Sequence, residues 1–154
     1  GFVDWPAGAT VSGFAAMEDE LDPLPLMARL SESGHPLALP VTTRRGEPLK
    51  FRSWTPGSPL VEAGYGLREP PRSAPHAEPD ILLVPLLAFD EAGYRLGFSA
   101  GYYDRTLAAL RAARTVVAIG IAFDQQKVEK VPHDRYDERL DWVLTPSGPL
   151  RIEG

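Results

Sequence analysis

The chain contains no cysteine among its 154 residues. This absence excludes disulfide bonds and a thiol nucleophile, and it is compatible with the reducing cytoplasm, where we expect the protein. No apolar run approaches the roughly 20 residues that a membrane-spanning helix needs. The formal net charge of −5 gives no basic excess for binding nucleic acid. We therefore expect neither nucleic acid nor a membrane as partner, although a local basic group can still bind a small anion.

Two common catalytic patterns are also missing. The only histidines are His35, His76 and His133, which are too scattered to suggest a three-histidine zinc site. No Gly-x-Ser-x-Gly sequence is present, which argues against a serine hydrolase. Proline and glycine, in contrast, are abundant, with 16 and 14 residues. Prolines cluster between residues 70 and 79, and we interpret this stretch as a loop within one domain, because the piece before it looks too small to fold alone.

Apolar segments with strand-like patterns alternate with helical patterns along the chain. Asp22 and Pro23 are predicted to start a helix as N-cap and first helical residue, and Gly34 to end it. A second helix is predicted after Gly101. Strands are predicted at residues 10–14, 37–41, 49–54, 81–84, 115–123 and 140–144. This order predicts a three-layer, Rossmann-like α/β fold with a mainly parallel central sheet, whose ligands bind outside the carboxyl ends of the strands.

The segment from Gly93 to Arg105 follows a buried apolar run and leads into the second helix. The most apolar part of that run is the strand predicted at residues 81–84, and we expect the strand to continue up to Asp90. A loop of small residues before a helix can bring backbone N–H groups close to a phosphate, and the helix N-terminus favours an anion. Arg95 and Arg105 flank the loop, and the planar guanidinium can donate two hydrogen bonds to a phosphate at once. A tight turn without a ligand remains the alternative on these residues alone.

Other side chains near this segment have two interpretations each. Asp104, in the first helical turn, either stabilises the helix dipole or holds Mg²⁺ beside phosphates. The helical spacing of Tyr103 suggests a core residue, whereas Tyr102 is a candidate for stacking on a ring. Asp134 and Asp137 lie beside a histidine and suggest either a metal site or a solvated loop, of which the residues alone favour the loop.

Several short motifs, spread over almost the whole chain, occur in a characteristic order. The motifs are residues 14–22, Gly66-Leu67-Arg68-Glu69-Pro70, Val84-Pro85-Leu86-Leu87-Ala88-Phe89-Asp90, Arg95-Leu96-Gly97, Gly101-Tyr102-Tyr103-Asp104-Arg105, Phe123-Asp124-Gln125-Gln126, Val131-Pro132, Asp137 and Asp141. Together they resemble the 5-formyltetrahydrofolate cyclo-ligase family, also called methenyltetrahydrofolate synthetase.

The resemblance implies a monomeric cytoplasmic ligase that uses ATP and Mg²⁺. Its expected reaction closes 5-formyltetrahydrofolate to 5,10-methenyltetrahydrofolate and releases ADP and phosphate, through phosphorylation of the formyl oxygen and attack by N10. Such phosphoryl transfer needs positioning and charge stabilisation more than an enzyme nucleophile. The alternative is a non-catalytic protein that binds reduced folate or a nucleotide on the same scaffold. A sugar-phosphate isomerase or transferase would need an acid–base pair that we do not find.

The resemblance also assigns site residues by position. It implies catalytic roles for Arg95, Tyr102 and Asp104, and a magnesium site made by Asp104 and Asp137. The nucleotide contacts are implied for Arg95, Gly97, Phe98, Ser99, Ala100, Gly101, Tyr102, Tyr103 and Arg105. The folate contacts are implied for Ala15, Met17, Glu20, Tyr102 and Tyr103. A carboxylate such as that of Glu20 suits a pterin, because it can accept two N–H donors from the aminopyrimidinone edge.

Two departures from the family pattern stand out. Phe98-Ser99-Ala100 replaces a loop that is usually richer in glycine and often basic. Ser99 can still donate a hydrogen bond to phosphate, whereas Ala100 offers no charged side chain. The family usually opens with a helix rich in Lys and Arg, which has no counterpart in this sequence. We therefore expect a single cyclo-ligase-like domain over residues 1–154 without that helix.

Overall fold

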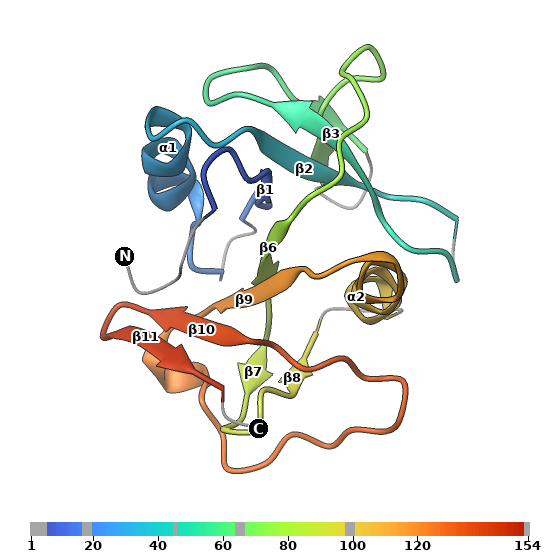
Figure 1. Ribbon diagram of the computed structural model, residues 1–154. Coiled ribbons are helices and arrows are strands. Elements are labelled where there is room, and N and C mark those ends of the chain that lie inside the picture. Colours follow the sequence, from blue (N-terminus) through green and yellow to red (C-terminus); the bar gives the residue numbers. More distant parts are fainter. Residues whose placement is uncertain (1–5, 17–19, 45, 64–66, 98–100, 153–154) are drawn as a thin grey trace.

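The computed structural model describes residues 6–16, 20–44, 46–63, 67–97 and 101–152 (Figure 1). Within these residues, seven strands form a sheet in the order β11-β10-β9-β6-β1-β2-β3. Neighbours from β10 to β2 pair in parallel, and the edge strands β3 and β11 are antiparallel, which confirms the predicted mainly parallel sheet. The strands are β1 (Val11–Ser12), β2 (Leu37–Val41), β3 (Lys50–Trp54), β6 (Ile81–Pro85), β9 (Val117–Ile121), β10 (Trp142–Thr145) and β11 (Gly148–Arg151).

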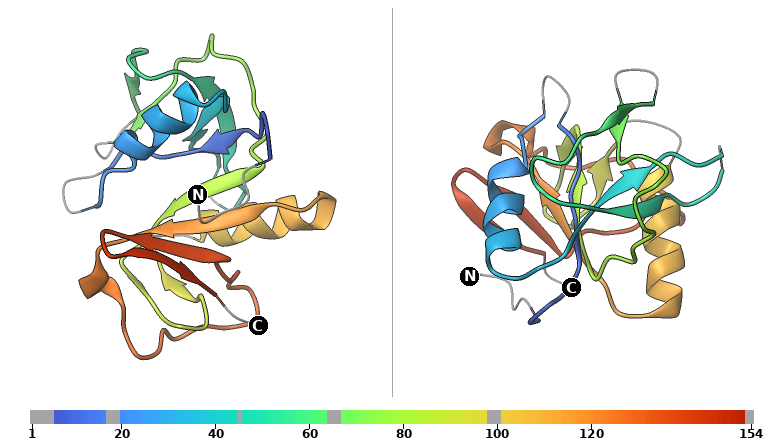
Figure 2. Two further views of the ribbon diagram at one scale, coloured as in Figure 1. Left: turned by 60° about the vertical axis from the view of Figure 1, so that its left-hand side comes forward. Right: turned by 90° about the horizontal axis from the view of Figure 1, so that it is seen from above.

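Two helices cover opposite faces of this sheet (Figure 2). Helix α1 (Leu24–Glu32) buries Met27 and Leu30 in a cluster with one face, and α2 (Tyr102–Ala113) buries Leu107 in a cluster with the other. The result is the predicted three-layer α/β arrangement. No helix in the described part of the chain is long and apolar enough to span a membrane.

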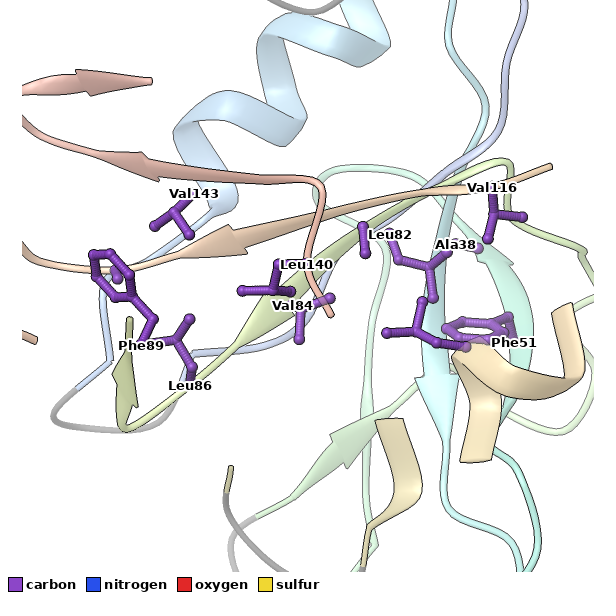
Figure 3. Close-up of a cluster of buried hydrophobic side chains, with 12 residues drawn as sticks. Ala38, Phe51, Leu82, Val84, Leu86, Phe89, Val116, Leu140 and Val143 are labelled. Atoms are coloured by element: carbon purple, nitrogen blue, oxygen red, sulfur yellow. The ribbon is translucent and has the colours of Figure 1, made fainter. Parts of the chain in front are cut away.

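Figure 3 shows the cluster on the α2 face, where side chains of several strands interdigitate. Leu82 and Val84 of β6 point into this cluster, whereas Ile81 and Leu83 point into the cluster under α1. Strand β6 is therefore covered on both faces, as its continuous apolar run predicts.

Helix α1 starts one residue later than predicted and ends as predicted. The helix begins at Leu24 with Pro23 as N-cap, so Asp22 is not the N-cap that we predicted. The Asp22 carboxylate still accepts a hydrogen bond from the Leu24 amide at 3.0 Å, which satisfies one of the free donors of the first turn. Gly34, at φ +93°, takes the left-handed conformation that ends the helix as predicted, and the amide of His35 donates to the Leu30 carbonyl.

The apolar run that we predicted as one strand up to Asp90 is interrupted. Strand β6 ends at Pro85, and the chain then forms the ribbon of β7 (Ala88–Phe89) and β8 (Arg95–Leu96) before α2. Part of the segment predicted as a glycine loop is therefore this ribbon, and only residues 97–101 join it to the helix. A second ribbon, β4 (Val61–Glu62) with β5 (Arg68–Glu69), directly precedes the proline-rich stretch of residues 70–79 that we interpreted as a loop.

The Asp90 side chain builds the turn between β7 and β8. Its Oδ1 accepts hydrogen bonds from the amides of Ala92 and Tyr94, both at 3.0 Å. Its Oδ2 accepts a third from the buried amide of Val131 at 2.9 Å. Gly93, at φ +88°, lies in this turn, and a Cβ there would be 2.8 Å from the Leu140 carbonyl oxygen. The ribbon is thus fixed to the segment that precedes β10.

Candidate active site

An apolar cavity of about 210 Å³ lies at the carboxyl ends of the parallel strands. Phe14 and Ala15 follow β1, Thr42 follows β2 and Pro85 ends β6, which is the position predicted for ligands in such a sheet. The full lining comprises Phe14, Ala15, Glu20, Pro40, Thr42, Leu49, Leu67, Arg68, Glu69, Pro85, Tyr102 and Tyr103. We call this space the apolar cavity.

A second cavity, of about 250 Å³, lies beside the first, and we call it the polar cavity. Its walls come from the end of β8, the start of α2 and the segment before β10. The lining comprises Arg95, Leu96, Gly97, Gly101, Tyr102, Tyr103, Asp104, Pro132 and Asp137. Tyr102 and Tyr103 line both cavities, so the two spaces meet at the first turn of α2.

The guanidinium of Arg95 is the main cation of the polar cavity. Its side chain is only 6% exposed, its carbon Cζ lies 5.4 Å from the centre of the Tyr103 ring, and Nη2 is 3.9 Å from Asp104 Oδ1. Burial lowers the pKa of Arg95, and the negative charge of Asp104 opposes that effect. Among the described residues, the buried Nε has no hydrogen-bond partner. A buried donor without a partner is costly, so this geometry suits an anionic ligand.

Arg105 lies on the other side of the turn, one helical turn into α2. Its Nε donates to the Glu47 carbonyl at 3.4 Å, and its Cζ lies 5.1 Å from the centre of the Tyr102 ring. Nη2 is buried and has no partner within the described part of the chain. Gly101, at φ +67°, precedes the helix in the left-handed conformation, and a Cβ there would be 3.0 Å from Arg105 Nη1. The turn thus brings two arginines with unused donors to the start of one helix.

The tyrosine pair connects the two cavities. The Tyr102 hydroxyl donates to the Thr43 carbonyl at 3.0 Å, which holds its ring beside the apolar cavity. Tyr103 packs against the core as its spacing predicts. Burial raises the pKa of Tyr103 above its usual range, Arg95 opposes the shift and Glu20 adds to it, so the phenol is neutral at physiological pH. The sequence left open which tyrosine faces a ligand, and the structure places both at the cavity walls.

Two carboxylates meet in the polar cavity. Burial raises the pKa of Asp104. The negative charge of Asp137 and a hydrogen bond between the two side chains raise this pKa further, whereas the hydrogen bond from the Glu138 amide and the positive charge of Arg95 oppose the shift. The Glu138 amide donates to Asp104 Oδ1 at 3.0 Å, and Asp137 Oδ2 accepts from the Asp134 amide at 2.9 Å. The described residues contain no group of three or more potential metal ligands. A pair of carboxylates nevertheless fits Mg²⁺, which takes one or two from the protein and the rest from water and phosphates.

The alternative metal cluster at His133 and Asp134 is not formed by the described side chains. The His133 ring stacks on Tyr94, with 3.5 Å between ring centres, and its Nδ1 lies 3.1 Å from the Val131 carbonyl oxygen. Asp134 Oδ1 accepts a hydrogen bond from the Tyr136 amide at 2.8 Å. These local contacts favour the solvated-loop interpretation for this part of the segment, while Asp137 alone turns into the polar cavity.

The remaining predicted residues are distributed between the cavities and the undescribed part of the chain. Ala15 and Glu20 line the apolar cavity together with the tyrosines, as the predicted folate contacts require. Predicted contacts that lie outside the described residues are those of Met17, Phe98, Ser99 and Ala100.

Sequence reasoning missed most of the apolar cavity. Pro40, Thr42 and Pro85 were not predicted there, although the rule that ligands bind at the carboxyl ends of strands could have found them. Glu69 was missed too, and its carboxylate accepts a hydrogen bond from the Thr42 amide at 2.7 Å, which brings β5 to the cavity wall. No local pattern could have indicated that contact.

Comparison with known proteins agrees with this geometry. The sequence model of the 5-formyltetrahydrofolate cyclo-ligase family matches residues 2–146. The 5-formyltetrahydrofolate cyclo-ligase of Mycolicibacterium smegmatis is 36% identical over 148 residues, which cover 91% of this chain and 75% of that protein. The enzyme of the same name from Escherichia coli K12 is 38% identical over 143 residues, covering 90% and 78%.

Solved structures give the same result. The NMR structure of Aquifex aeolicus 5,10-methenyltetrahydrofolate synthetase superposes with a TM-score of 0.76 at 27% identity, covering 96% of this chain and 73% of that one. The Mycoplasma pneumoniae protein, a 5,10-methenyltetrahydrofolate synthetase, shares the fold with a TM-score of 0.67 at 24% identity, covering 94% and 74%. With its sequence match over nearly its whole length, its three-layer fold and its paired cavities, the chain belongs to the 5-formyltetrahydrofolate cyclo-ligase family.

Proposed function

We propose that this protein catalyses the ATP-dependent cyclisation of 5-formyltetrahydrofolate to 5,10-methenyltetrahydrofolate, with release of ADP and phosphate. The observation that carries the proposal is that an apolar cavity and a polar cavity with a buried arginine meet at Tyr102 and Tyr103. The reaction requires the formyl group of a pterin ring system and a triphosphate to meet at one point. The names of the relatives from M. smegmatis and E. coli support the same activity.

The pterin ring of the folate occupies the apolar cavity in this proposal. Phe14 and Leu49 supply apolar contact surface, and Tyr102 supplies an aromatic wall on which a ring can stack. Glu20 lines the same cavity, and its carboxylate can accept the two N–H groups of the aminopyrimidinone edge. The formyl group on N5 then points to the wall that the two cavities share.

The triphosphate of ATP occupies the polar cavity. Arg95 lines this cavity, whereas Arg105 lies at the same helix start outside its lining. Each has a buried nitrogen without a partner among the described residues that can donate to a phosphate oxygen. The N-terminus of α2, a helix of 12 residues, adds a favourable field for an anion at the same place. Asp104 and Asp137 would hold Mg²⁺, which when bound neutralises the charge of the phosphates during transfer.

The chemistry divides into two steps. The formyl oxygen attacks the γ-phosphorus, the bond from this phosphorus to the bridging oxygen of ADP breaks, and ADP leaves. N10 then attacks the formyl carbon and loses its proton, and the bond from that carbon to the phosphate oxygen breaks, which leaves the methenyl bridge and free phosphate. Arg95 stabilises the charge on the oxygens of the transferred phosphoryl group, and the ring of Tyr103 packs against the Arg95 guanidinium.

The protein acts in this proposal as a cytoplasmic monomer, with one domain over residues 1–154. The lack of cysteine and the net charge of −5 are compatible with that setting. Light scattering after size-exclusion chromatography tests the monomer, because a dimer would double the mass of 16.8 kDa.

A single assay tests the activity. The protein is mixed with 5-formyltetrahydrofolate, Mg²⁺ and ATP, and the methenyl product is followed by its absorbance. We expect product only when ATP is present, with ADP and phosphate formed in equal amounts. Binding of folate without product under these conditions would favour a non-catalytic folate-binding protein on the same scaffold.

A further inference from the structure

Arg111 lies in the last turn of α2, two helical turns after Asp104 and outside the linings of both cavities. We propose that Arg111 is a positioning residue that clamps the segment before β10 to α2 and thereby sets the distance between the carboxylates of Asp104 and Asp137. The inference rests on the proposed function, because it concerns how the magnesium-binding pair of that site is held.

The contacts of Arg111 converge on one short segment. Nη1 donates to Glu138 Oε1 at 3.1 Å, and Nη2 donates to the Arg139 carbonyl at 2.8 Å and to Asp141 Oδ2 at 3.1 Å. The side chains of Arg111 and Glu138 are only 27% and 25% exposed, so water screens this pair less than a pair on the open surface. One guanidinium therefore holds three acceptors within four consecutive residues.

Glu138 transmits this clamp to the polar cavity. Its carboxylate is bound by Arg111, while its backbone amide donates to Asp104 Oδ1 at 3.0 Å. Both partners belong to α2, so Glu138 is fixed to the same helix at two points. Asp137 is the residue directly before Glu138, and the distance between their Cα atoms is fixed at about 3.8 Å. The position of Asp137 opposite Asp104 therefore follows from the contacts of Glu138.

The other end of the segment is fixed to the sheet. Asp141 Oδ2 accepts a hydrogen bond from the Ala118 amide at 2.8 Å as well as the one from Arg111, and the Asp141 amide donates to the Ala118 carbonyl at 2.8 Å. Arg111 thus connects helix α2, the segment and strand β9. Asp137 Oδ2 accepts a hydrogen bond from the Asp134 amide in a local turn, and the Asp137 side chain is also hydrogen-bonded to Asp104, a bond that requires a shared proton and is lost when both groups are ionised.

A clamp is needed because the two carboxylates repel each other once both are ionised, as binding of Mg²⁺ requires. Asp104 and Asp137 lie in one cavity, and the pair is partly buried, so their repulsion is stronger than in water. Without Arg111, Glu138 and Asp141 would also lose the cation that neutralises them, and the segment would move away from α2. Mg²⁺ demands near-ideal octahedral geometry, so a wider spacing of its two carboxylates would weaken its binding.

The test compares Arg111→Gln with Arg114→Gln in the full chain. Arg114 also lies at the end of α2 and also binds a carboxylate, Asp80 Oδ1 at 2.6 Å, but this contact is at the amino end of β6, away from the carboxyl ends that line the apolar cavity. We expect Arg111→Gln to raise the Mg²⁺ concentration for half-maximal turnover about tenfold, the size typical for losing a group that supports a metal ligand. The KM for 5-formyltetrahydrofolate should not change, and Arg114→Gln should change neither value.

A second measurement does not depend on turnover. In the metal-free protein, exchange of the Glu138 amide hydrogen reports opening of its bond to Asp104, and we expect Arg111→Gln to accelerate it about tenfold relative to Arg114→Gln. Arg111→Lys, which keeps one ion pair, should restore part of both effects. If Arg111→Gln does not fold, Glu138→Gln breaks the same pair while keeping the backbone amide and should give the same two results.

The outcomes are separable from those of the proposed function. Equal Mg²⁺ requirement and equal Glu138 exchange in the Arg111 and Arg114 variants would overturn the inference. Turnover of the unaltered protein without any Mg²⁺ dependence would instead overturn the magnesium site of the proposed function, and the exchange of the Glu138 amide would still decide whether Arg111 clamps the segment.

Discussion

Gly97 lies against the guanidinium of Arg95, so that a Cβ atom at position 97 would overlap Arg95 Nη1. The overlapping atom is the far end of a flexible side chain, which can move at little cost in stability. The absence of a side chain at position 97 therefore keeps the Arg95 guanidinium in the polar cavity, between Tyr103 and Asp104.

Gly97→Ala should displace Arg95 without unfolding the protein. We expect kcat to fall about tenfold or more, because a shift of about 1 Å in a positioned charge is costly for catalysis. The thermal unfolding midpoint should change little, and circular dichroism and steady-state kinetics measure the two effects. Gly57 is a control, because the space around its Cβ position is open, although its φ of +89° adds backbone strain to Gly57→Ala. Equal kcat for Gly97→Ala and the unaltered protein would contradict the role of this contact.

Asp104→Asn should lower Mg²⁺-dependent turnover by about 100-fold, because it removes one of two carboxylates that would hold the ion. The fold should be kept, since an amide oxygen can still accept the hydrogen bond from the Glu138 amide. Turnover measured over a range of Mg²⁺ concentrations tests this, and unchanged turnover would remove Asp104 from the metal site.

The raised pKa of Asp104 adds a pH dependence to the same variant. A carboxyl whose pKa is higher in the folded than in the unfolded protein stabilises the fold when protonated, and this contribution is lost as pH rises through the folded value. In metal-free solution at neutral pH, Asp104→Asn should therefore be more stable than the unaltered protein. The difference should vanish in acid below the unfolded pKa, and urea unfolding at several pH values measures it.

Glu20→Gln should weaken folate binding selectively. An amide offers one acceptor oxygen without charge, so one of the two bonds to the aminopyrimidinone edge becomes unfavourable. We expect the KM for 5-formyltetrahydrofolate to rise about tenfold while the KM for ATP stays the same. Both values come from initial rates with the other substrate saturating. An equal rise in the KM for 5-formyltetrahydrofolate and the KM for ATP would indicate that Glu20 stabilises the fold and does not bind the pterin.

Asp90→Ala should destabilise the protein by about 3 kcal/mol, because the amides of Ala92, Tyr94 and Val131 lose a charged acceptor. Asp90→Asn should cost less, since one amide oxygen can keep the two bonds of the turn. Urea unfolding gives both free energies. Equal losses for the two variants would show that the turn bonds contribute little and that the Val131 bond dominates.

Several elements were predictable because short-range rules determine them. The apolar stretch at residues 37–41 was predicted with the bounds of β2, and the apolar run at residues 81–84 predicted all of β6 except its last residue, Pro85. Gly34 and Gly101 adopt left-handed conformations where a helix ends and where another begins, which is a property of glycine itself. The site residues near α2 were proposed from the family resemblance of one contiguous motif, and those from Gly101 to Asp104 line the polar cavity.

The ribbon of β7 and β8 was not predictable in the same way. Each strand has two residues, too short for any periodic pattern, and the turn between them depends on the three bonds of Asp90. One of these bonds comes from Val131, which is distant in the sequence. The sequence analysis therefore placed Arg95 at the edge of a loop and missed that it belongs to strand β8.

The sequence alone determined the types of chemistry in this protein, with two arginines, two tyrosines and a carboxylate around one helix start, and no thiol. The family resemblance already implied that Asp137 joins Asp104 and that Glu20 joins the tyrosines. Only the tertiary structure decided the contacts that hold the site together, such as Arg111 against Glu138 and Glu69 against the Thr42 amide. The physical reason is that backbone preferences and helix capping act over a few residues, so a short stretch of sequence determines them. Contacts between distant segments depend on the order of strands in the sheet, which no short stretch of sequence contains.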